Sequence, residues 1–131
     1  MTDEATAAFA ALVLGATPVH RIAEDAGNVA FLAPRPVRPG HVIVAPRAGV
    51  DSVWDLDDTA HAGLWRFVGD VARALRSRLP CERVCVSVIG WAVRHAHVHL
   101  VPTDAPGQVP GLDGPPLEDA AAAALAERLR G

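Results

Sequence analysis

Three histidines alternate with apolar residues in the segment His95-Ala96-His97-Val98-His99-Leu100-Val101. A neutral imidazole is a nitrogen nucleophile near pH 7, because the unperturbed pKa of histidine is about 6.5. Attack on phosphorus would give a phospho-imidazole that water can break, which divides one difficult displacement into two easier steps. Neighbouring imidazoles could donate hydrogen bonds to phosphate oxygens or protonate a leaving group. The segment therefore predicts nucleophilic catalysis at phosphorus by one of its histidines.

Two other interpretations fit the same residues. Histidine pairs on a strand bind zinc, and three neutral imidazoles suffice for a catalytic metal site. Such a site usually includes a carboxylate that orients the ligands, and residues 89–102 contain none. The three histidines could also be surface or half-buried residues with satisfied hydrogen bonds and no chemical task.

Residues 95–101 are predicted to form a strand, because polar and apolar residues alternate up to Leu100. Side chains on a strand point alternately to its two faces. All three imidazoles should therefore share one face, while Ala96, Val98 and Leu100 belong to the core. We expect the imidazole face to look into a cleft, because titratable rings make a poor core layer.

The elements that must position these histidines read as strand pairs around one long helix. Residues 84–89 are β-branched and apolar, which predicts a central strand. A turn at 24–28 uses Gly27 and Asn28, which tolerate positive φ. The fold expected is an α+β domain: an antiparallel sheet of about five strands, covered on one face by the long helix. The expected elements are a helix at 3–14 capped by Thr2 or Asp3, strands at 19–23, 29–32, 41–45, 84–89 and 95–101, a helix from 57 or 58 to 79, and a helix at 117–130.

The chain has 131 residues, of which 50% are hydrophobic and 21% charged, with a formal net charge of −3. This predicts one domain over residues 1–131, with its core at about 9–102, a Pro- and Gly-rich loop at 103–116 and a C-terminal helix. The acidic balance argues against binding to a nucleic-acid backbone. The chain contains no lysine, which excludes lysine Schiff-base and P-loop chemistry.

Cellular location is predicted from what the chain lacks. Cys81 and Cys85 are too few for a disulfide framework, and we interpret them as small apolar residues in a reducing compartment. The first residues are acidic, unlike a secretory leader, and no apolar run approaches the roughly 20 residues that span a bilayer. We expect a cytoplasmic protein with no membrane partner.

The segment 95–101 resembles the histidine motif of the histidine-triad (HIT) superfamily, with a small Ala96 at its first apolar position. Pro39-Gly40-His41-Val42-Ile43-Val44-Ala45-Pro46-Arg47 resembles a second motif of that superfamily, and residues 24–32 resemble its first hairpin. The resemblance covers about residues 9–102. It implies a nucleotide hydrolase or nucleotidyl transferase that acts at an α-phosphate of phosphoramidates, dinucleoside polyphosphates or nucleotide sugars. It also implies that no catalytic metal or other cofactor is used. A homodimer is common among small members, with the long helix and a strand at its interface.

The resemblance assigns roles to four histidines. His97 would be the nucleophile, held by a hydrogen bond from its other ring nitrogen to a backbone carbonyl. His99 would contact the phosphate or the leaving group. His95 and His41 would form a supporting layer of hydrogen bonds.

A nucleotide-binding slot is implied by alignment of the hairpin. Phe9, Leu12, Phe31 and Pro34 would bind the base by stacking and burial, although simple core packing is the alternative for each. Trp91 would be a lid or stacking platform, or a turn residue packed on a dimer partner.

Several positions depart from the superfamily pattern. Ala33 stands where many members carry an Asp or Asn that binds the ribose hydroxyls, and Trp91 and Ala92 replace polar residues ahead of the histidines. A non-catalytic nucleotide-binding protein therefore remains an alternative. Zinc-binding cysteines of some relatives align with Ala7 and Ala10, so no structural zinc is expected. Arg47, at the usual lysine position, is a candidate phosphate contact, whereas strand parity points Arg94 away from the imidazoles.

Overall fold

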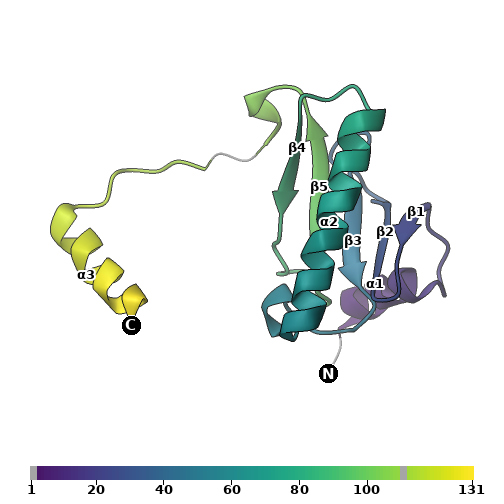
Figure 1. The fold of residues 1–131 in the computed structure, drawn as a ribbon, viewed down its shortest axis with the longest axis horizontal. Coiled ribbons are helices and arrows are strands. Elements are labelled where there is room, and N and C mark those ends of the chain that lie inside the picture. The colour runs from purple at the N-terminus through teal and green to yellow at the C-terminus, as the bar shows by residue number, and fades with distance from the viewer. Residues whose placement is uncertain (1–2, 110–111) are drawn as a thin grey trace.

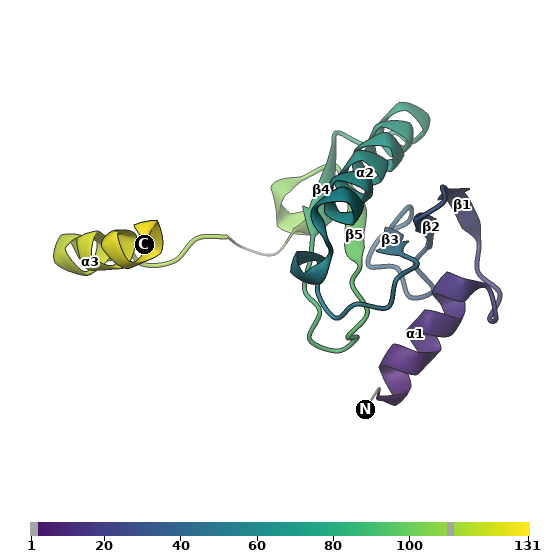
Figure 2. The same ribbon diagram turned by 60° about the horizontal axis from the view of Figure 1, so that its bottom comes forward.

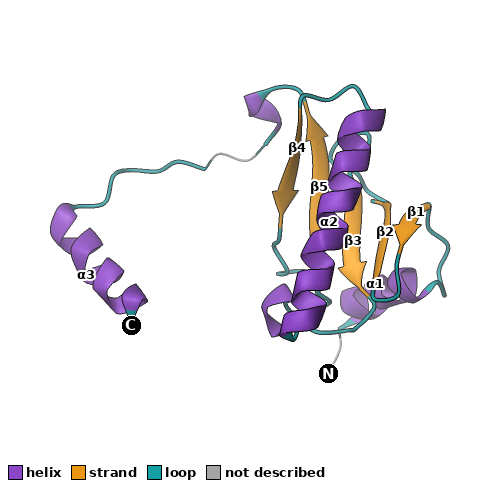
Figure 3. Ribbon diagram, in the orientation of Figure 1, coloured by secondary structure: helices purple, strands orange, loops and turns teal. Residues whose placement is uncertain are grey.

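A computed structural model describes residues 3–109 and 112–131 of the chain. Figure 3 shows helices and strands in one α+β arrangement, which confirms the predicted fold class. The elements in chain order are α1 (Glu4–Leu14), β1 (Arg21–Glu24), β2 (Asn28–Leu32), β3 (Val42–Pro46), the 3₁₀-helix η1 (Val53–Asp55), α2 (Asp58–Arg78), β4 (Arg83–Ser87), β5 (Val98–Thr103), the 3₁₀-helix η2 (Pro106–Gln108) and α3 (Asp119–Arg130).

The five strands form one antiparallel sheet in the order β1-β2-β3-β5-β4 (Figure 1). The central pair is β3 and β5, in which Ile43 lies opposite His99. This register brings the segment around His41 beside the histidine segment, although 58 positions separate His41 from His99. The prediction of a central strand at 84–89 is wrong, because β4 is an edge strand. Its β-branched residues suggested burial on two sides, yet Val86 and Val88 stay exposed.

The two faces of the sheet are covered by different helices (Figure 2). The long helix α2 packs over alternate residues of the central strands, including Val42, Val44 and Leu100. The short helix α1 covers the opposite face, where Phe9 and Val13 pack against Phe31 and other residues of β2 and β3. The sequence predicted α1 but did not predict that the second face would be covered.

Helix α2 forms where the apolar spacing predicts it. The Asp57 side chain accepts a hydrogen bond of 2.8 Å from the Ala60 backbone N–H, which caps the first turn. Pro80 follows the C-terminal cap residue Leu79 and prevents the helix from continuing. One face is buried against the sheet through residues three or four positions apart: Leu64, Phe67, Val68, Val71 and Leu75.

The terminal segments also contain the expected helices. Asp3 caps α1 by accepting a hydrogen bond from the Thr6 N–H, and Thr2, the other predicted cap, lies outside the described residues. Helix α3 lies away from the sheet and buries no side chain (Figure 1). The predicted loop at 103–116 contains η2, and its residues 110–111 lie outside the described residues. Within the part of the chain that the structure describes, no helix is long and apolar enough to cross a bilayer.

Candidate active site

The histidine segment approaches the sheet before it joins it. Strand β5 begins at Val98, so the prediction of a strand from residue 95 is wrong at its N-terminal end. Residues 95–97 lie outside the strand. The Ala96 N–H instead donates to the carbonyl of Val50, a loop residue, at 2.8 Å. The alternation survives this change: Ala96, Val98 and Leu100 are buried in the core under α2.

Hydrogen bonding and burial fix the protonation state of the His97 ring. Its Nδ1 lies 2.7 Å from the His95 carbonyl oxygen, which can only accept, so Nδ1 carries the proton. Nε2 therefore keeps a free lone pair. Burial lowers the pKa of His97, while the bond to the His95 carbonyl opposes that shift in part. At neutral pH the ring is thus uncharged and its Nε2 can attack an electrophile.

His41 and His99 form a relay whose proton positions are fixed by the backbone. The Val37 N–H donates to His41 Nδ1 at 3.1 Å, so the proton of the neutral His41 ring sits on Nε2. His41 Nε2–H then donates to His99 Nδ1 at 2.9 Å. His99 must consequently carry its proton on Nε2, as a donor available to a ligand.

The charge state of His99 supports this assignment. Burial lowers its pKa to about 4, with further contributions from His97 and His41. Burial likewise lowers the pKa of His41. Both rings are neutral near pH 7, and the relay can donate a hydrogen bond without carrying a positive charge.

His95 completes the row of rings. Its Nε2–H donates to the Pro46 carbonyl at 2.9 Å, which ties it to the end of β3. The ring centroids of His97 and His99 lie 4.9 Å apart. The structure therefore brings all four predicted histidines together and gives each a defined hydrogen-bond partner.

Most of the residues predicted to bind the base lie in the apolar cluster beside these rings. The Phe9 ring centroid lies 4.8 Å from that of His97 and 6.1 Å from that of Phe31. Leu12 and Ala33 pack in the same apolar cluster. Phe31 is fully buried, so it would support a base from below, and Pro34 is exposed and lies outside the cluster.

A cavity of about 250 Å³ opens on another side of His97. Its lining includes Trp91, which the sequence nominated, and Trp54, which the sequence analysis missed. The pattern Ser52-Val53-Trp54-Asp55 is a capping box, which could have indicated a fixed turn that presents Trp54. Arg94 is exposed and lines this cavity together with His95 and His97. Strand parity does not apply to it, because β5 begins only at Val98.

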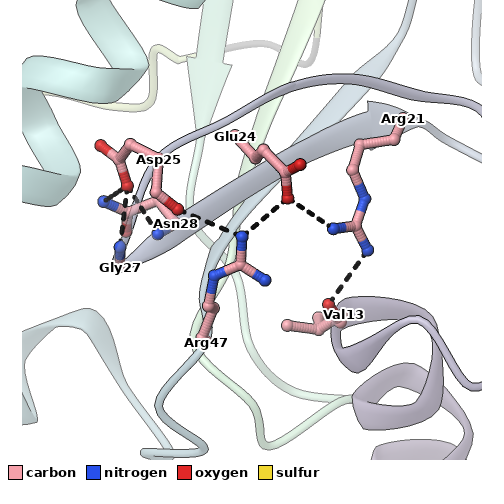
Figure 4. A network of polar contacts seen from close by, with 7 residues as sticks. All are labelled: Val13, Arg21, Glu24, Asp25, Gly27, Asn28 and Arg47. Atoms are coloured by element: carbon pink, nitrogen blue, oxygen red, sulfur yellow. Dashed lines mark hydrogen bonds and ion pairs between the residues drawn. The ribbon is translucent and has the colours of Figure 1, made fainter.

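The arginine nominated for phosphate binding is engaged elsewhere (Figure 4). Arg47 Nη2 donates to Glu24 Oε2 at 2.8 Å and to the Asp25 carbonyl at 3.1 Å. Arg21 donates to the same Glu24 oxygen, and these two arginines lower the pKa of the Glu24 carboxyl. The network joins β1 to the end of β3, so Arg47 acts there as a structural ion-pair partner.

The turn between β1 and β2 closes in an unpredicted way. Neither Gly27 nor Asn28 has a positive φ. Instead, Asp25 Oδ1 accepts hydrogen bonds from both backbone N–H groups, at 2.9 Å and 2.8 Å (Figure 4). An Asx-type side-chain contact thus replaces the left-handed turn that the Gly-Asn pair suggested.

Residues 3–109 and 112–131 contain no set of side chains that would support the interpretation as a metal site. No three His, Cys, Asp or Glu side chains in these ranges are placed to hold one ion. One ring nitrogen each of His95, His97 and His99 is committed to a carbonyl oxygen or to His41. Cys81 and Cys85 are free thiols.

Comparisons with known proteins identify the family and the fold. The HIT domain profile matches residues 15–105. The chain is 27% identical over 101 residues to Protein hit of Bacillus subtilis, across 72% of this chain and 68% of that protein. It is 28% identical over 80 residues to the asymmetrical bis(5′-nucleosyl)-tetraphosphatase of Schizosaccharomyces pombe, across 57% of this chain and 44% of that enzyme. A crystal structure of a Bacillus subtilis HIT family member superimposes with a TM-score of 0.83 over 93% of each chain, at 21% identity.

Proposed function

The chain belongs to the HIT domain family, and from that premise we propose that it hydrolyses or transfers a nucleoside phosphate group through a nucleotidyl-His97 intermediate. One observation carries the proposal. The His95 carbonyl fixes the proton of His97 on Nδ1, which leaves a neutral Nε2 lone pair on a buried ring. A relative with sequence similarity is a bis(5′-nucleosyl)-tetraphosphatase, which supports substrates of this class.

In the first step, the His97 Nε2 lone pair attacks the α-phosphorus of the substrate. A P–N bond forms, and the bond from phosphorus to the leaving group breaks with its electron pair. A phosphate leaving group departs as the anion, and an amine leaving group takes a proton from water or departs already protonated. The imidazolium character that develops on His97 is stabilised by the Nδ1–H bond to the His95 carbonyl.

His99 contributes a fixed donor during this step. Its Nε2–H can hydrogen-bond a phosphate oxygen or the leaving atom, because His41 holds its Nδ1 as an acceptor. In the second step, water attacks phosphorus and the P–N bond breaks. The nucleoside monophosphate leaves, the proton from water passes to solvent, and His97 Nε2 regains its lone pair.

The base is placed by the apolar cluster beside the histidines. Phe9 lies against both His95 and His97, with ring centroids 5.3 Å and 4.8 Å apart. A nucleoside attached to a phosphate at His97 would therefore have an aromatic face within reach. The buried Ala33 offers no acceptor to ribose hydroxyls, so we expect weak discrimination between ribose and deoxyribose.

The test uses radiolabelled adenosine 5′-phosphoramidate and the variant His97→Gly. The wild type should turn over the substrate and yield label on the protein after rapid denaturation without acid, and the variant should lose at least about 10³-fold in kcat. Nucleotide binding without turnover or labelled protein would favour the non-catalytic alternative. Equal turnover by wild type and variant would overturn the proposal.

We also propose that two copies associate through β4 and the adjacent face of α2. Strand β4 is a sheet edge, and its Val86, together with Val88 and Ile89 just beyond it, is exposed. An apolar edge strand is an available pairing surface. Light scattering in solution should give twice the 13.7 kDa mass of the chain, and a value equal to one chain would contradict this assembly.

A further inference from the structure

Two tryptophans flank the cavity beside His97. Trp54 is 72% exposed and Trp91 is 81% exposed, although indole rings are large and mostly apolar. Both line the cavity of about 250 Å³ whose inner end is formed by the buried His95, Ala96 and His97. Large apolar side chains gathered around one opening mark a ligand or partner site more often than scattered exposed residues do.

Trp54 is held in place by the fold around it. Ser52 and Asp55 form a reciprocal capping box that fixes η1. The His61 ring lies behind Trp54 with centroids 6.0 Å apart, and it accepts a hydrogen bond of 3.0 Å from Trp65 Nε1. The exposed indole is therefore supported on one side by a tilted ring contact, which lowers the entropy that binding would cost.

The opening also has a charged rim. Arg94 Nη1 lies 3.7 Å from Asp51 Oδ2, and the Arg94 guanidinium carbon lies 6.0 Å from the centroid of the Trp91 ring. The segment that carries Arg94 is anchored, because the Arg94 N–H donates to Thr6 Oγ1 at 2.8 Å. A planar group entering the cavity would meet aromatic faces first and then the row of imidazoles.

We propose that Trp54 and Trp91 form a pocket that binds the planar aromatic part of the leaving group of a nucleoside phosphate substrate. This inference rests on the proposed function and specifies its substrate class. Phe9 lies outside the cavity lining, so the slot beside it and the tryptophan pocket are separate regions that share His97. The cavity has room for one ring system, being smaller than the roughly 300 Å³ at which pockets for drug-sized ligands begin.

The absence of an amide or hydroxyl side chain at positions 91 and 92 agrees with this assignment. Trp91 and Ala92 occupy the turn directly ahead of the histidine segment. A site lined by indole rings recognises a leaving group by stacking, which tolerates different rings, rather than by hydrogen bonds to one of them. The pocket should thus prefer aromatic over aliphatic leaving groups, with little selection among aromatic ones.

The test compares two adenosine 5′-phosphoramidates that differ only in the amine, naphthylethylamine or ethylamine. In the wild type, kcat/KM should be higher for the naphthyl substrate, and Trp54→Ala or Trp91→Ala should reduce the ratio of the two values by about tenfold. Trp54→Phe, which keeps an aromatic face, should retain most of the ratio. Leu129→Ala removes an equally exposed apolar side chain from α3 and should leave the ratio unchanged.

Calorimetry with free naphthylethylamine separates the pocket from the reaction. Loss of naphthylethylamine binding in Trp54→Ala would support the pocket even if neither phosphoramidate were hydrolysed. The lack of hydrolysis would then reject the proposed function but not the pocket. A wild-type ratio near one, or a ratio unaltered in both alanine variants, would overturn the pocket. A change of solution mass in Trp91→Ala with equal losses on both substrates would assign Trp91 to a subunit interface and also overturn it.

Discussion

The two faces of the sheet differ in what covers them. Beneath α2 lies an apolar cluster contributed by β2, β3, η1, β5 and the segment before β5. Beneath α1, the apolar cluster over β2 and β3 ends at Phe9, and the imidazoles of His95, His97 and His99 continue the row. The face under α2 therefore resembles an ordinary protein core. On the face under α1, core side chains lie directly beside the imidazoles.

This difference indicates how the histidines are kept in position. Their ring nitrogens bond to the Pro46 and His95 carbonyls, the Val37 N–H and each other. None of these partners is a side chain of α2. The geometry of the site should therefore depend on backbone positions set by β3 and β5, while α2 supplies stability to the sheet that holds those positions.

The largest expected effect comes from weakening the α2 face alone. Leu64 of α2 is fully buried against the sheet, and Leu64→Ala should lower the free energy of unfolding by about 2–5 kcal/mol through lost burial and a residual cavity. Urea titration measures this change. At a temperature where the variant is folded, kcat/KM should stay within about twofold of wild type.

The control for this experiment is Leu14→Ala, which removes an exposed leucine of α1 and should change stability by less than about 0.5 kcal/mol. A large loss of kcat/KM in folded Leu64→Ala would show that the two faces are coupled, contrary to the comparison above.

The sequence predicted most of the elements because their signals are local. The apolar spacing of α2, its Asp57 cap and the alternation of the histidine segment each involve neighbours in the chain. The order of strands in the sheet is set by contacts between distant segments, so the position of β4 at the edge was not predicted. An apolar residue such as Val86 does not indicate whether its strand has neighbours on both sides or lies at the edge of the sheet.

The candidate site shows the same division. Alternation was sufficient to place the three histidines on one face, and the resemblance added His41 and the role of His97. The proton positions depend on backbone groups of Val37, Pro46 and His95. Nearly every residue type has such groups, so the sequence could not predict these partners. Trp54 was missed because its partner residues across the cavity lie some 34 to 43 positions later, from Val88 to His97.

The second prediction concerns how the buried histidines make the free energy of unfolding depend on pH. Burial lowers the pKa of His99 to about 4 in the folded chain, from its ordinary value of 6.5. Between these values the unfolded state binds a proton that the folded state does not, so the free energy of unfolding should fall as pH falls from about 6.5 to about 4. Burial of His41 and His97 acts in the same direction.

This stabilisation is fully present above pH 6.5, and its loss from His99 should reach a few kcal/mol at most, on the scale of about 1.4 kcal/mol for each unit of pKa. Urea titrations at intervals from pH 7.5 to pH 4 measure it. His99→Gln should flatten the slope, whereas His20→Gln removes an exposed histidine outside the cluster and should leave it unchanged. A slope equal in wild type and His99→Gln would contradict the assignment.

The smallest effect is expected where an ion pair lies at the margin of the histidine face. Arg47 is directed to Glu24 and to the Asp25 carbonyl, so Arg47→Ala should change KM for a nucleotide substrate by less than about twofold. The matched variant Arg21→Ala removes the other arginine bound to Glu24 and should behave in the same way. If Arg47 instead released Glu24 to bind a phosphate, Arg47→Ala would raise KM at least tenfold while Arg21→Ala would not. Steady-state kinetics on the two variants thus decides whether the anion-binding part of the site extends beyond the imidazoles.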